Sequence, residues 1–112
     1  MHELSLLENV RDILVSHAKS QNFSQVSKVT LEIGKLSCVE VEALRFAFDV
    51  VMKSSLAENA ELILSELDGI GYCQPCGQNT LMEQLYDACA YCGRPLVVVQ
   101  GMEMKIKDLV VI

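Results

Sequence analysis

The chain has 112 residues, of which 51% are hydrophobic, and a formal net charge of -6. This length suits one compact domain with or without a small module, and the hydrophobic fraction argues against disorder. The negative charge disfavours nucleic-acid binding, because phosphates carry the same sign. No apolar run reaches the roughly 20 residues that span a bilayer. A secretion signal would need a basic start, which is missing, so we expect a cytoplasmic protein without membrane contact.

Two helices are predicted, each opened by a capping box. The first box lies at 5–8, and apolar residues follow it at helical spacing to about Ser20. His17 falls on this apolar stripe, which favours a core or boundary histidine over a metal ligand. The second box lies at 37–40, and the helix behind it ends near Leu56.

Strands are predicted around these helices. They cover 28–33, 61–67, 96–100 and 102–107. The composition changes at 69–71 and stays poor in long aliphatic runs to about Pro95, which indicates a small module. We expect the last strand to return to the first sheet, so that a zinc-binding domain at 71–98 is inserted into an α/β domain of residues 1–70 and 99–112. The predicted fold class is α+β, a small mixed sheet with two helices plus an inserted zinc-ribbon-like module.

Two Cys-x-x-Cys-Gly units give the strongest signal in this module. Their cysteines are Cys73, Cys76, Cys89 and Cys92. This spacing lets two thiolates reach one metal, and the following glycine tolerates the positive φ of the tight turn. Four thiolates leave no open coordination position, so the site is structural. Zinc is favoured because it is redox-silent, although a rubredoxin-like iron site stays open.

Disulfides or a redox pair are the alternative explanation of these cysteines. The total of 5 Cys is odd, and neither unit opens a helix in a β-α-β pattern, which disfavours both. The fifth cysteine, Cys38, falls in the first turn of the second predicted helix. We expect it to be a buried or half-buried structural thiol.

The first residues, Met1-His2-Glu3, carry a quieter signal. A free α-amine, the amide nitrogen of His2 and its imidazole Nδ1 can close a five-membered and a six-membered chelate ring. Three nitrogens in one plane suit Ni(II) or Cu(II), whereas zinc has no preference for that geometry. Taken alone, the pattern favours a solvated terminal histidine over a metal ligand, because many proteins carry histidine at position 2.

The whole chain resembles the HypA/HybF family of hydrogenase nickel-incorporation proteins. The resemblance rests on Met1-His2-Glu3-Leu4-Ser5-Leu6, on the segment from Leu31 to Glu40 and on the two cysteine units, which occur in that order. It implies a nickel metallochaperone with Ni(II) on Met1 and His2, a contribution from the backbone amide or side chain of Glu3, and structural Zn(II) on the four cysteines. The partners implied are the maturation GTPase HypB and the large-subunit precursor of a [NiFe] hydrogenase, with a homodimer as a further option.

No nucleophile with an adjacent base and no phosphate-binding glycine loop is present, so we expect neither an enzyme nor a GTP-binding protein. Two other functions stay open at this point. One is a zinc-ribbon module that recruits a protein or nucleic acid without any nickel, although only Glu83 and Asp87 are charged between Cys73 and Cys92. The other is an iron redox protein, which would be coloured.

Overall fold

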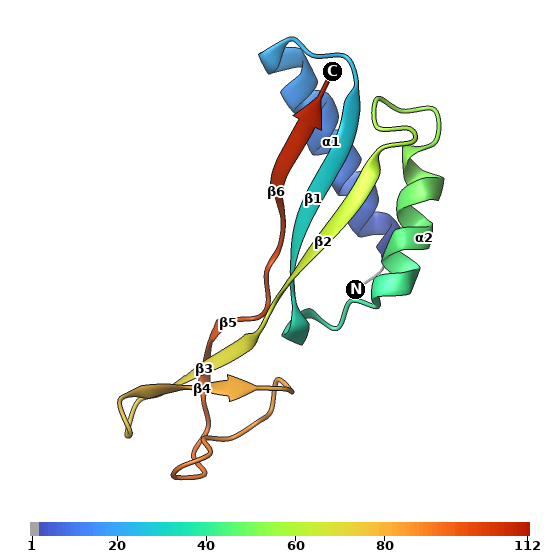
Figure 1. The fold of residues 1–112 in the computed structure, drawn as a ribbon. Helices are drawn as coiled ribbons and strands as arrows, with labels where there is room; N and C mark the ends of the chain where they lie inside the picture. Colours follow the sequence, from blue (N-terminus) through green and yellow to red (C-terminus); the bar gives the residue numbers. More distant parts are fainter. Residues whose placement is uncertain (1–2) are drawn as a thin grey trace. The chain divides into compact units, whose positions relative to one another are not determined.

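The computed structural model describes residues 3–112. Within them, two helices, a short 3-10 helix and six strands follow one another along the chain (Figure 1). The elements are α1 (Glu3–Gln21), β1 (Val26–Gly34), η1 (Lys35–Ser37), α2 (Val41–Met52), β2 (Glu61–Leu67), β3 (Gly69–Cys73), β4 (Gln78–Met82), β5 (Val97–Gln100) and β6 (Met104–Val111). Two helices with two small sheets confirm the predicted α+β class.

The chain divides into two units that are each discontinuous in sequence. Unit 1 consists of Met1–Leu31, Val39–Leu64 and Ile106–Ile112, and unit 2 consists of Glu32–Cys38 and Ser65–Lys105. Apart from the boundary after Cys38, the bounds of the units fall inside strands β1, β2 and β6. The functional division into a nickel domain (1–70, 99–112) and a zinc domain (71–98) stays a prediction.

The first sheet has the strand order β2-β1-β6. Strands β1 and β2 run in the same direction in Figure 1, joined by α2, while the β6 arrow points the opposite way. A hydrogen bond from the Ile112 N–H to the Gln25 carbonyl (2.9 Å) and one from the Ser27 hydroxyl to the Val110 carbonyl (3.2 Å) fit an antiparallel β1–β6 pair. The expected return of the last strand to the first sheet is therefore confirmed.

The core of unit 1 lies between this sheet and the helices. Helix α1 buries Leu7, Val10 and Leu14, at the spacing of one helix face. Helix α2 buries Leu44, Ala47, Phe48, Val51 and Met52. The prediction that His17 shares the buried stripe of α1 is wrong, because its side chain is exposed.

Both helices begin elsewhere than the capping boxes predict. Helix α1 starts at Glu3, so Ser5 lies inside its first turn. Helix α2 is capped by Glu40, whose carboxylate accepts the N–H groups of Glu42 (3.2 Å) and Ala43 (2.7 Å). Cys38 precedes this cap with a φ of 61° and an exposed side chain, so its predicted place in the helix and its predicted burial are wrong.

Unit 2 contains the second sheet, an antiparallel array in the order β4-β3-β5. Strands β3 and β4 were missed at the sequence level, since neither has a long apolar alternation. They form a hairpin whose connecting turn, 74–77, is the first cysteine unit itself. The sheet therefore delivers Cys73 at the end of β3 directly into the predicted metal site.

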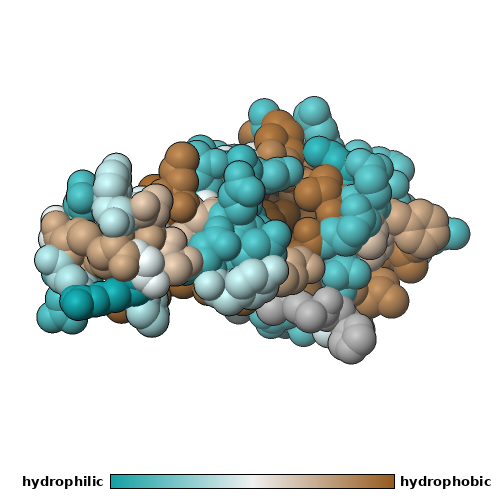
Figure 2. All heavy atoms as spheres, turned by 90° about the horizontal axis from the view of Figure 1, so that it is seen from below, coloured by the Kyte–Doolittle hydropathy of each residue, from teal (hydrophilic) through white to brown (hydrophobic). Residues whose placement is uncertain are grey.

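The surface of the molecule mixes apolar and polar side chains. On the face drawn in Figure 2, hydrophobic side chains in brown reach the surface between hydrophilic ones in teal. Neither helix within residues 3–112 combines the length and the apolar character that crossing a bilayer requires.

Candidate metal centres

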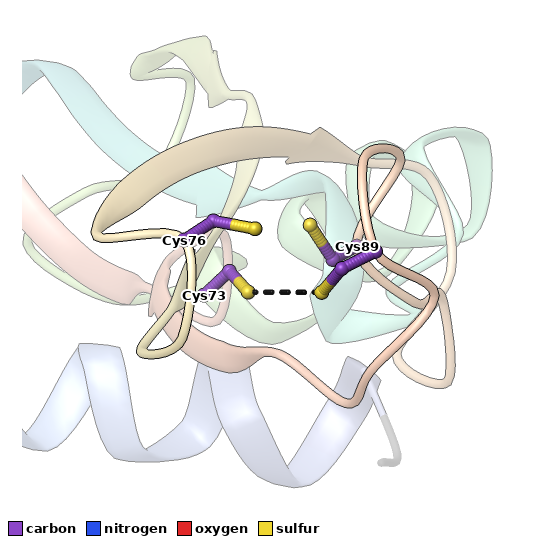
Figure 3. A group of neighbouring side chains, drawn as sticks. Cys73, Cys76 and Cys89 are labelled. Atoms are coloured by element: carbon purple, nitrogen blue, oxygen red, sulfur yellow. Dashed lines mark hydrogen bonds between the residues drawn. The ribbon is translucent and has the colours of Figure 1, made fainter.

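The two cysteine units bring four sulfur atoms together in unit 2. The Sγ atoms of Cys73, Cys76, Cys89 and Cys92 all lie within 4.8 Å of one another. Figure 3 shows the side chains of Cys73 and Cys76 extending from one loop toward Cys89 on the facing loop. Cys73 and Cys89 are buried, Cys76 is half-buried and Cys92 is exposed. The prediction that these four residues converge is confirmed by the geometry.

Each unit is shaped by the same backbone turn. The Gly77 N–H donates to the Cys73 carbonyl at 2.8 Å, and the Gly93 N–H donates to the Cys89 carbonyl at 2.8 Å. The φ angles of Gly77 and Gly93 are 67° and 74°, in the left-handed region that glycine adopts most easily. A Cβ at either glycine would meet no atom within 4 Å, so backbone conformation alone selects glycine there. These observations confirm the role predicted for both glycines.

The second unit also aims a backbone donor at a sulfur, since the Tyr91 N–H lies 3.4 Å from the Cys89 Sγ. Hydrogen bonds from the backbone N–H groups of Cys92 and Tyr91 lower the pKa of Cys89 to about 7. Thiolate is the form that binds metal, so Cys89 is prepared for ligation near neutral pH.

Cys76 behaves in the opposite way. Hydrogen bonding to the Cys92 sulfur, followed by that to Cys73, raises the pKa of Cys76 to about 12. Without a metal, four sulfurs this close cannot all ionise, because their negative charges repel one another. A cation placed among them would remove that penalty and release protons, so metal binding here is coupled to pH.

The distances fit a tetrahedral metal ion. Zn–S bonds of about 2.3 Å place the corners of a thiolate tetrahedron about 3.8 Å apart. The observed separation of Cys73 Sγ and Cys92 Sγ is 3.5 Å, and the largest in the set does not exceed 4.8 Å. Small movements of the side chains would therefore close the four sulfurs around one ion, with no position left for a substrate.

The predicted nickel residues are described only in part. Met1 and His2 lie outside the described residues. Glu3 is the first residue of α1 and is half-buried. The first four N–H groups of a helix have no acceptor within that helix, so the amide of Glu3 has none within α1. The site residues as a set stay a prediction.

Comparison with known proteins places this architecture in a family. A family model described as "Hydrogenase/urease nickel incorporation, metallochaperone, hypA" matches residues 1–111. The chain is similar to proteins named hydrogenase maturation factor HypA from Xanthobacter autotrophicus (46% identity, covering 100% of both chains) and Rhodobacter capsulatus (44% identity, covering 100% of both).

The fold also matches solved structures. The solution structure of the nickel metallochaperone HypA from Helicobacter pylori superimposes with a TM-score of 0.75 at 24% identity, covering 100% of this chain and 98% of that one. At this identity the likeness concerns the fold. The family model and the curated relatives carry the assignment, which agrees with the resemblance noted in the sequence. The chain belongs to the HypA family of hydrogenase and urease nickel-incorporation metallochaperones, which carry metal and are not enzymes.

Proposed function

We propose that this chain binds Ni(II) through Met1, His2 and Glu3 and delivers it during maturation of a [NiFe] hydrogenase. The observation that carries the proposal is the Met-His-Glu start of a chain that matches the nickel-incorporation family over residues 1–111. Nickel is the cargo in this proposal. We propose HypB and the large-subunit precursor of the hydrogenase as the partners, and the cytoplasm as the place.

The start of α1 supports the nickel site chemically. The amine of Met1, the amide nitrogens and the imidazole of His2 would supply planar nitrogen donors, which Ni(II) favours. Two deprotonated amides, those of His2 and Glu3, would balance the double positive charge of the ion. The positive end of the helix dipole at Glu3 would then face a complex without net charge rather than a bare cation.

We further propose that the four-cysteine cluster holds Zn(II). The sulfur separations and the closed coordination support a structural site. When bound, zinc supplies charge that keeps all four thiols ionised and ties the two cysteine units together. Nickel on the terminal nitrogens and zinc on the sulfurs would thus be separated by ligand type, because thiolates suit zinc and planar amides suit nickel.

The decisive experiment uses the two histidines of the chain as a matched pair. Untagged wild type, His2→Ala and His17→Ala are titrated with Ni(II), and bound nickel and zinc are measured by elemental analysis. His17 is exposed on α1, so its removal tests any general loss of surface imidazole. We expect His2→Ala to lose nickel binding, while His17→Ala binds like wild type and all three proteins keep one zinc.

Nickel uptake should also weaken below about pH 7, where the imidazole and the α-amine take up protons, since the usual pKa values of these groups are about 6.5 and 7.8. An N-terminal extension should remove binding as His2→Ala does, because the free amine is one of the ligands. A nickel titration of His2→Ala that equals wild type would refute the chelate. Iron in place of zinc, seen as colour, would refute the zinc assignment alone.

A further inference from the structure

Helix α2 exposes a phenylalanine that the core does not use. Phe46 is 73% exposed, whereas Phe48, two residues later, is 2% exposed and belongs to the core of unit 1. Val50, one helical turn beyond Phe46, is 53% exposed. Helix α2 therefore carries a second apolar stripe beside its buried face, and most of this stripe is exposed to solvent.

The second stripe borders a groove between the two helices of unit 1. The groove has a volume of about 300 Å³, and residues of α1 and α2 form its walls. Its lining residues are Glu3, Leu4, Ala43, Phe46, Ala47 and Val50. Leu4 is 52% exposed, so apolar side chains from both helices reach solvent at the same place. A groove between two helices with an aromatic side chain at its edge has the shape that receives one face of a partner helix.

Carboxylates outnumber cations around the groove. On the surface of α2, the neighbours of Phe46 at positions i-4 and i+3 are Glu42 and Asp49, both exposed, and Glu3 lines the groove from α1. None of these three carboxylates forms an ion pair with another residue of 3–112. The nearby Arg45 donates to the Leu62 carbonyl at 3.0 Å. The rim is acidic, so it complements a basic partner.

The size of the groove points to a transient partner and not to a second copy. A stable dimer buries roughly 800 Å² and 20–30 residues on each side, whereas six residues line this groove. A second copy would also bring the same acidic rim against itself. A small apolar contact with complementary rim charges suits an encounter that must end once the metal has moved.

We propose that this groove docks an amphipathic helix, apolar on one face and flanked by Lys or Arg, from the protein that exchanges nickel with the chain. The link to nickel rests on the function proposed above, because Glu3 lines the groove and directly follows His2 in the chain. A partner bound at Phe46 would contact Glu3, so the metal-binding side chains of that partner would lie near the proposed nickel residues. Phe46 anchors the partner, while Glu3, Glu42 and Asp49 orient it.

The test uses a synthetic fluorescent peptide with leucines along one helix face and lysines on both sides of them. Its binding to the full, zinc-loaded chain is measured by anisotropy for wild type, Phe46→Ala and Tyr86→Ala. Tyr86 is 82% exposed and lies in unit 2, so it controls for loss of any exposed aromatic ring. We expect Phe46→Ala to weaken binding at least about tenfold and Tyr86→Ala to leave it unchanged. The double variant Glu42→Gln with Asp49→Asn should reduce both the affinity and its dependence on salt.

Three outcomes overturn the docking proposal. In the first, the Phe46→Ala variant binds the peptide as tightly as wild type does. In the second, wild type binds equally well a permuted peptide that has the same composition but no apolar face. Dimerisation of wild type that Phe46→Ala abolishes, seen by sedimentation velocity, is the third, because a second copy would then occupy the groove. Nickel titrations of the same variants separate the two proposals: failure of wild type to take up nickel removes the link to nickel exchange, whereas peptide docking is judged by anisotropy alone.

Discussion

The two units of this chain reach a fixed structure by different means. Of the buried apolar side chains in residues 3–112, fourteen lie in unit 1, where helix faces and sheet enclose a conventional core. Unit 2 has five, and two of these are Cys73 and Cys89. Apart from its cysteines, the buried apolar side chains of unit 2 are those of Ile33, Leu36 and Met82.

This difference shows what the four-cysteine cluster contributes. A segment with so few buried side chains gains too little from apolar burial to offset the conformational entropy lost on ordering. Turns, hairpin hydrogen bonds and the sulfur cluster must supply the remainder, and a metal bound by the four thiolates would be the strongest of these. Unit 1 needs no such device, because the apolar side chains between its helices and sheet supply this burial.

Loss of the sulfur cluster should unfold unit 2 and leave unit 1 folded. Cys73→Ser, or removal of the metal with a chelator, deletes a contribution that in zinc-finger peptides amounts to about 10–16 kcal/mol. We expect the amide signals of unit 2 to lose their chemical-shift dispersion in NMR spectra, while the helical circular dichroism of α1 and α2 persists. Intact hydrogen-exchange protection in β3 and β4 after metal removal would show that unit 2 has a sufficient core of its own.

A core deletion in unit 1 should do the converse. Phe48→Ala is expected to lower the free energy of unfolding of unit 1 by about 3–5 kcal/mol, because a fully buried ring leaves a cavity. Urea unfolding followed by circular dichroism measures this loss, and zinc content should not change. Phe46→Ala is the matched control, since its ring is 73% exposed and its removal should cost under about 0.5 kcal/mol. Equal losses in the two variants would contradict the division between core and docking surface.

A smaller effect is expected from a single carboxylate of unit 2. The Gly101 N–H donates to Glu103 Oε1 at 2.6 Å, and this hydrogen bond holds the pKa of Glu103 below its usual range. A depressed folded pKa stabilises the protein above the unfolded value of about 4.3 and loses that effect as the pH falls through the folded value. Glu103→Gln should therefore melt slightly lower than wild type near pH 7, with the difference vanishing in acid. A difference that stays constant with pH would exclude this contribution.

The sequence predicts best what is decided locally. The spacing within each cysteine unit and the following Gly77 and Gly93 determine a turn of a few residues, so the two cysteine turns could be predicted directly. The strand 61–67 was predicted with the bounds that β2 has. The hairpin of β3 and β4 was missed because its pairing depends on the turn between the strands and not on an apolar pattern within them.

Periodicity identifies the face of a helix but not what covers each turn of that face. His17 continues the stripe of Leu7, Val10 and Leu14, yet it is exposed to solvent. The start of α2 was misplaced for a related reason. The Ser37 hydroxyl donates a hydrogen bond to the Gly34 carbonyl at 2.7 Å within η1. Glu40 therefore caps the helix in its place. Competition between local hydrogen bonds decided the outcome, and the sequence motif alone does not reveal which bond wins.

The placement of the first cysteine unit in a hairpin turn constrains how the lengths of its segments can vary. Cys73 and Cys76 are held at the end of the β3–β4 pair. A residue inserted between them would therefore disrupt both the strand pairing and the binding of a metal ion by the two thiolates. The stretch that follows β4 is different, because its hydrogen bonds to Glu83 and Gln84 are local and come from Asp87, whose carboxylate accepts both N–H groups. For a flexible loop, doubling the length costs only about 0.6 kcal/mol of closure entropy. Chain-length variation within the family should therefore gather between the cysteine units and be excluded from within them.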